Sequence, residues 1–73
     1  MTTFTQAQKE IIKSLPTIGF LKWDMNIFTC DGIRVNLYAP QSPLVKVVDT
    51  RPTPSVVADV PTDEALEYIL GIL

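Results

Sequence analysis

The sequence predicts a small α+β domain, in which an N-terminal and a C-terminal helix cover one face of a mainly antiparallel sheet of three to four strands. Three features support this prediction. Apolar residues recur at helical spacing near each end of the chain. Between them, two runs of β-branched and aromatic residues flank Asp31-Gly32, a pair typical of a tight hairpin turn. At 73 residues, the chain is expected to form a single domain, residues 1–73.

The hairpin, residues 26–38, sets the expected register of the sheet. If Asp31 and Gly32 form the turn, Cys30 lies opposite Ile33, and the preceding residues pair with the following ones in order. Because side chains alternate, one face should belong to the core and carries Phe28, Cys30, Ile33, Val35 and Leu37. The other face is amphipathic, solvated or in contact with a partner, and carries Ile27, Thr29, Arg34, Asn36 and Tyr38.

The first helix is expected over residues 6–14. Thr5 and Gln8 have the spacing of a capping box, in which each side chain bonds to the backbone N–H of the other residue. Pro16 should end the helix, because the residue before a proline avoids the α region. The apolar positions at helical spacing are Phe4, Ala7, Ile11, Ile12 and Leu15.

The second helix is expected to follow Thr62, whose side chain can cap it. Asp63 and Glu64 suit the positive end of its dipole. Gly71 should weaken its last turn. The apolar stripe expected to pack on the sheet consists of Leu66, Ile69, Leu70 and Leu73.

Further strands are expected on both sides of the hairpin, over residues 20–24 and 44–49. In the first strand the alternation is blurred, so either both faces are buried or one aromatic residue stays exposed, and core packing is the favoured interpretation of Trp23. Five of the six prolines lie between Pro40 and Pro61. Because prolines interrupt a strand ladder, only residues 56–60 could add a short edge strand.

Composition argues against several classes of chemistry. The chain has no histidine and one cysteine, so it lacks the commonest general base and cannot form a familiar zinc site. Turn positions account for four aspartates and a helix surface for three further carboxylates. A hydrolase built on a carboxylate pair would need a pocket that a domain of this size rarely has. We therefore expect no enzymatic activity, no cofactor and no metal.

The charge pattern bears on partners and location. The net charge is −2 and the six cations are scattered, whereas a nucleic-acid-binding protein concentrates positive charge, so direct nucleic-acid binding is not expected. No apolar run is long enough to span a membrane. Lys9, Glu10 and Lys13 lie where a signal peptide would be apolar, so we expect a cytoplasmic protein.

Protein–protein contact is the function class that these observations favour. Interfaces are enriched in aromatic residues and arginine. The candidate partner-binding residues are Arg34, Asn36 and Tyr38 on the second face of the hairpin, together with Arg51 and Trp23.

Three stretches carry a resemblance to known proteins: the opening MTTFTQAQKEIIKSL, the hairpin IFTCDGIRVNLY and the closing TDEALEYILGIL. In its layout of helix, sheet and helix, the chain resembles the small host-takeover proteins of lytic bacteriophages, in particular the short transcription regulators of Xanthomonas phages. The resemblance covers the layout of the whole chain and assigns no residue roles.

The resemblance implies a non-enzymatic protein of the host cytoplasm that binds the β and β′ subunits of host RNA polymerase. It further implies inhibition of transcription initiation by displacement of the sigma factor. The free protein is expected to be a monomer. The alternatives are another small inhibitor or adaptor, of the anti-restriction or anti-CRISPR type, and a structural subunit that self-associates through the open sheet face.

Overall fold

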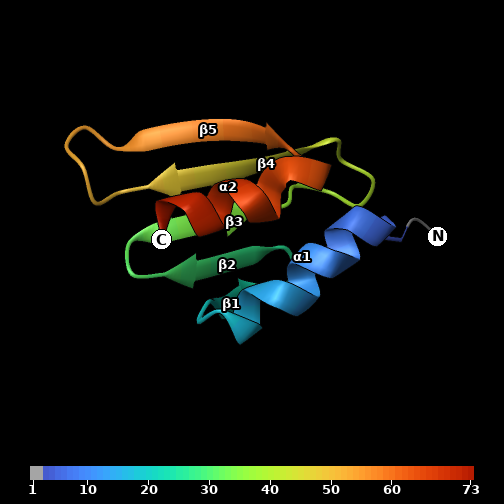
Figure 1. The fold of residues 1–73 in the computed structure, drawn as a ribbon. Helices are drawn as coiled ribbons and strands as arrows, with labels where there is room; N and C mark the ends of the chain where they lie inside the picture. Colours follow the sequence, from blue (N-terminus) through green and yellow to red (C-terminus); the bar gives the residue numbers. More distant parts are fainter. Residues whose placement is uncertain (1–2) are drawn as a thin grey trace.

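The computed structural model describes residues 3–73 and shows a five-stranded antiparallel sheet with two helices packed on one face (Figure 1). The helices are α1 (Gln6–Thr17) and α2 (Ala65–Ile72), the latter preceded by a 3₁₀ turn, Thr62–Glu64. The strands follow in sequence order across the sheet: β1 (Leu21–Asp24), β2 (Ile27–Cys30), β3 (Ile33–Asn36), β4 (Leu44–Asp49) and β5 (Val56–Pro61). The predicted α+β class is confirmed.

The sheet has one strand more than the three to four that were predicted, because residues 56–61 form a full strand. The prolines that interrupt this part of the chain lie before β5 or at its last residue, so no proline occupies its interior. Within residues 3–73, no helix is long and apolar enough to cross a lipid bilayer.

The hairpin register is confirmed. Asp31 and Gly32 have φ angles of 44° and 86°, as a type I′ turn requires, and Cys30 pairs with Ile33. The predicted core face is buried at four of its five positions, and Cys30 is half-buried beside them. Both helices lie over this face (Figure 1). The remaining buried apolar residues of the core are Ile11, Leu15, Phe20, Val45, Val47, Val60, Ala65 and Ile69.

Helix α1 begins as predicted but ends later. The capping box is present, with the Gln8 backbone N–H donating to Thr5 Oγ1 at 3.1 Å and the Thr5 N–H donating to Gln8 Oε1 at 2.9 Å. The prediction that Pro16 ends the helix is wrong, since the helix continues through Pro16 to Thr17. In the last turn a proline forfeits only one backbone hydrogen bond, and the N–H of Phe20 closes the end by donating to Leu15 O at 3.0 Å.

The fully buried Gln8 also ties α1 to the loop between β3 and β4. Its amide nitrogen donates to Ala39 O at 3.1 Å, and Oε1 accepts from the Gln41 N–H at 3.0 Å. Together with the bond from Thr5, these contacts use both ends of the side-chain amide. Gln8 therefore caps α1 and also fixes the position of this helix against the loop between β3 and β4.

The prediction that Trp23 packs in the core is wrong, since 71% of this residue is exposed. The pairing of β1 with β2 is irregular between Lys22 and Asp24, where a β-bulge breaks the alternation of side chains. Trp23 lies within this bulge on the side of the sheet that the helices do not cover. Phe20, just before β1, enters the core instead.

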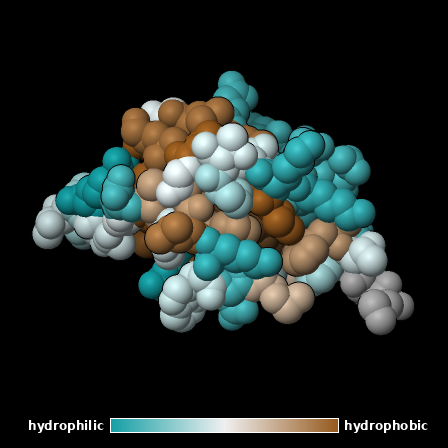
Figure 2. All heavy atoms as spheres, turned by 90° about the horizontal axis from the view of Figure 1, so that it is seen from below, coloured by the Kyte–Doolittle hydropathy of each residue, from teal (hydrophilic) through white to brown (hydrophobic). Residues whose placement is uncertain are grey.

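Helix α2 packs through part of the predicted apolar stripe, since Ile69 is buried and Leu66 packs against the core. The Thr62 hydroxyl caps no helix but donates to Ser42 O at 3.0 Å, and the 3₁₀ turn delays the start of α2 to Ala65. Ala65 and Ile69 are buried, whereas Leu70 and Leu73 are 55% and 51% exposed. Figure 2 accordingly shows apolar atoms gathered on the side of the molecule where α2 ends.

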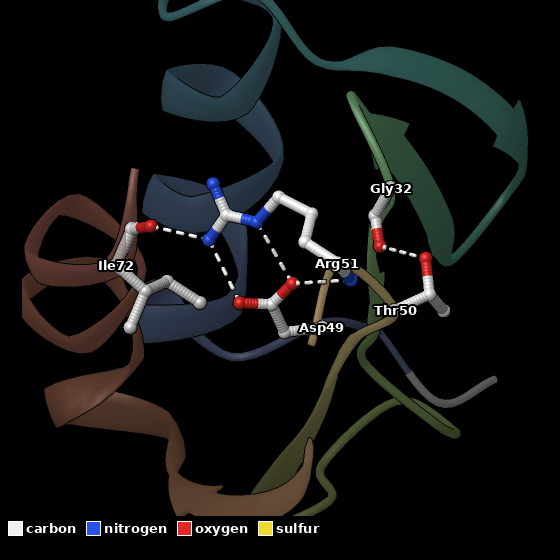
Figure 3. A network of polar contacts seen from close by, with 5 residues as sticks. All are labelled: Gly32, Asp49, Thr50, Arg51 and Ile72. Carbon is white, nitrogen blue, oxygen red and sulfur yellow. Dashed lines mark hydrogen bonds and ion pairs between the residues drawn. The ribbon is translucent and has the colours of Figure 1, made fainter. Parts of the chain in front are cut away.

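The C-terminal end of α2 is held by a polar clasp from the loop after β4 (Figure 3). Arg51 binds Asp49 through two side-chain hydrogen bonds, Nε to Oδ1 at 2.8 Å and Nη2 to Oδ2 at 2.7 Å. Arg51 Nη2 also donates to the Ile72 backbone oxygen at 2.5 Å. Since α2 has no basic residue in its last turn, Arg51 supplies the cation that favours this end of the helix dipole.

The clasp predicts a pH-dependent contribution to stability. The bonds from Arg51 lower the pKa of Asp49 from its ordinary value of 3.8 to about 2. The ion pair therefore stabilises the folded state fully above about pH 4 and loses this effect as the pH falls through about 2. We expect Asp49→Asn to unfold more easily than the wild type at pH 7, and thermal unfolding followed by circular dichroism should show the difference shrinking between pH 4 and pH 2. A difference that stays constant over this range would contradict the assignment.

Candidate protein-binding face

The face of the sheet opposite the helices, called the open face below, is uncovered from β1 to β5. One row of paired residues crosses the five strands of this face in the order Leu21, Thr29, Arg34, Val48 and Val57. Leu21 and Val57, at its two ends, are 74% and 57% exposed. The open face thus presents apolar side chains on both sides of a central arginine.

Trp23 and Arg34 lie next to each other on the open face. Arg34 Cζ is 6.0 Å from the centroid of the Trp23 ring, at the outer limit of a cation–π contact. Both side chains are exposed. Arg34 also borders a hollow of about 240 Å³. The other residues that line it are Thr29, Gly32, Ile33, Val48 and Thr50.

Asn36 and Tyr38 form a second, polar group. Tyr38 has a φ of 62°, and its N–H donates to Asn36 Oδ1 at 2.8 Å, which holds the chain in this unusual conformation. Its hydroxyl reaches β5 and donates to Asp59 Oδ1 at 2.6 Å. This bond to a carboxylate raises the pKa of Tyr38 above its ordinary value of 10.0. Both residues are half-buried and are engaged in contacts within the chain.

Arg51 lies apart from the other four candidates, in the clasp at the end of α2. The structure therefore brings Trp23 and Arg34 together, sets Asn36 and Tyr38 beside each other, and gives Arg51 an intramolecular role. Leu21 and Val57 were not among the predicted site residues. In β5 the alternation between exposed Val57 and buried Val60 was such a signal, and the proline-rich surroundings obscured it. In β1 all four residues are exposed, so no alternation marks Leu21.

Groups that could perform acid–base chemistry lie apart or in solvent. Residues 3–73 contain no cluster of three or more His, Cys, Asp or Glu side chains that could hold a metal ion. Glu64 and Glu67 line one surface hollow together with Val60 and Tyr68, but both carboxylates are exposed. The half-buried Cys30 has Asp31 Oδ2 3.9 Å from its sulfur.

No protein-family model, no curated protein and no solved structure matches this chain.

Arg34 should be replaceable without loss of the fold. Its guanidinium is exposed, and a cation–π contact at such a site contributes about 0.5–1 kcal/mol. We therefore expect Arg34→Glu to lower the midpoint of thermal unfolding by about 4–8 °C at most. The emission of the single tryptophan, Trp23, should change because its neighbouring cation is removed.

The matched control is Lys9→Glu, which makes the same charge change on the exposed side of α1 and should leave the tryptophan emission as it is. Failure of Arg34→Glu to fold would show that Arg34 supports the core and not the open face.

Proposed function

We propose that this protein is a non-enzymatic inhibitor of transcription that binds bacterial RNA polymerase through its open face. The observation that carries the proposal is the exposed group on the open face, with Trp23 beside Arg34 at its centre and Leu21 and Val57 at the two ends of the row. Tryptophan and arginine are the residue types that most often dominate the binding energy of protein interfaces. Exposed apolar side chains around them exclude water when a partner docks.

The identity of the partner rests on the resemblance to the short phage regulators of host RNA polymerase. On this proposal the chain contacts the large β and β′ subunits and prevents initiation by displacing the sigma factor. The net charge of −2 suits a target whose surfaces handle nucleic acid. A domain of this size can act in this way by occupying a surface that another protein needs.

The test is direct binding of the purified protein to purified bacterial RNA polymerase. We expect the wild type to bind core enzyme, to compete with sigma factor and to reduce promoter-dependent transcription in vitro. Trp23→Ala and Arg34→Glu should each weaken binding by at least about tenfold, the effect typical of residues at the centre of an interface. We expect both variants to fold, because both side chains are exposed.

Lys9→Glu serves as the matched control, because it reverses a charge on the helical side and should bind polymerase like the wild type. Equal loss of binding in Arg34→Glu and Lys9→Glu would indicate general charge attraction and would overturn the assignment of the open face. Absence of binding by the wild type would overturn the choice of RNA polymerase as partner.

A further inference from the structure

The two outer edges of the sheet differ in how they are protected. β1 is short and carries the bulge between Lys22 and Asp24, and bulges and edge lysines are devices that prevent strand pairing. β5 spans Val56–Pro61, pairs with β4 without a bulge and contains no lysine or arginine. Figure 1 shows β5 at the margin of the sheet with no element beyond it. β5 therefore presents a regular strand edge to solvent.

The hydrogen-bonding pattern between β4 and β5 shows which backbone groups of β5 point away from the sheet. The Thr62 N–H donates to Pro43 O at 3.0 Å, and bonded pairs in an antiparallel ladder recur every second residue. Val60, Ala58 and Val56 therefore exchange hydrogen bonds with β4. The N–H and C=O groups of Val57 and Asp59 point away from the sheet. Two donors and two acceptors are thus available at the edge.

Carboxylates flank this edge on both faces of the sheet. On the helical side, α2 lies beside β5, and Glu64 and Glu67 line a hollow with Val60 and Tyr68. Among residues 3–73, neither glutamate has an ion-pair partner, since the ion pair in this part of the chain joins Asp49 and Arg51. On the open face, Asp59 accepts a hydrogen bond from Tyr38 and lies opposite Lys46 of β4, so its charge is already partnered. A chain segment lying along β5 would therefore meet unpaired carboxylates on the helical side.

We propose that the edge of β5 binds an extended peptide segment of another protein with basic side chains, which joins the sheet as an additional strand. Backbone groups of the segment would pair with Val57 and Asp59. Lysine or arginine side chains on its helical side would reach Glu64 and Glu67. The position of both glutamates near the start of α2 also suits the helix dipole, so the unpaired edge beside them, and not their charge alone, carries the proposal. This site is separate from the open face and goes beyond the proposed function.

A second copy of the chain is a poorer occupant of the same edge. An antiparallel pair of β5 strands related by a two-fold axis would bring the two α2 helices next to each other on the same side of the joined sheet. The joined sheet would then carry Glu64 and Glu67 of both copies on the same side, and like charges across an interface are unfavourable. The charge pattern selects a basic partner over self-pairing.

The test uses a synthetic peptide, acetyl-Lys-Val-Lys-Val-Lys-Val-Lys-amide, and backbone amide NMR of the full chain. We expect the peptide to shift the amide signals of β5 and to slow hydrogen exchange at Val57 and Asp59. A peptide with glutamate in place of lysine should not bind. A peptide with proline in place of valine keeps the charge but cannot form a ladder, and it too should leave these amides unprotected.

Two variants separate the contributions of the backbone and the charge. Val57→Pro removes an N–H that points away from β4, so it should fold and lose peptide binding. Glu67→Gln should weaken binding about threefold, as expected for one exposed charge pair, whereas Glu10→Gln on α1 is the matched control and should have no effect. Because Glu67 lies exposed on the surface of α2, Glu67→Gln should fold. It therefore still tests the site if Val57→Pro does not fold.

Three results would overturn the proposal: equal binding of the glutamate peptide, signal changes centred on the open face, or slow exchange at Val57 and Asp59 without peptide together with a dimer in sedimentation. Trp23→Ala should bind the peptide as the wild type does. The edge site can therefore fail or succeed independently of the polymerase interface.

Discussion

The register of the β2–β3 hairpin is the constraint on which the rest of the structure depends. Asp31 and Gly32 accept the positive φ angles of a two-residue turn, and this turn fixes Cys30 opposite Ile33. Because side chains alternate along a strand, a shift of one residue would exchange the two faces of the sheet. The turn therefore decides that Phe28 and Val35 face the helices while Arg34 faces away from them.

The same register propagates outward through the neighbouring strands. β4 pairs with β3 and places Val45 and Val47 in the core, and β5 in turn pairs with β4 and adds Val60. Two helices, one of 12 and one of 8 residues, cover only one side of this sheet. The uncovered side keeps Arg34 at the centre of the row and exposed Leu21 and Val57 at its ends, which is the physical basis of the proposed interface.

Intramolecular contacts explain several polar residues that could be mistaken for functional ones. Gln8 is buried, and both ends of its amide form hydrogen bonds. Asn36 and Tyr38 hold a strained turn, and Tyr38 also reaches Asp59. Arg51 joins the end of α2 to Asp49. These residues hold loops and helix ends against the sheet. Trp23 and Arg34 are exposed and remain available to a partner.

The sequence by itself determined the α+β class, the hairpin with its register and the capping box of α1. These features depend on residues close together in the chain, where turn geometry and backbone hydrogen bonding act locally. The tertiary structure alone decided that α1 runs through Pro16, that a bulge turns Trp23 outward, and that β5 forms a full strand against β4. It also decided that Arg51 clasps α2 and that Leu70 and Leu73 stay exposed. The pairing of β5 with β4, the contact of Arg51 with α2 and the exposure of Leu70 and Leu73 depend on contacts between distant segments, whose relative placement no local pattern specifies.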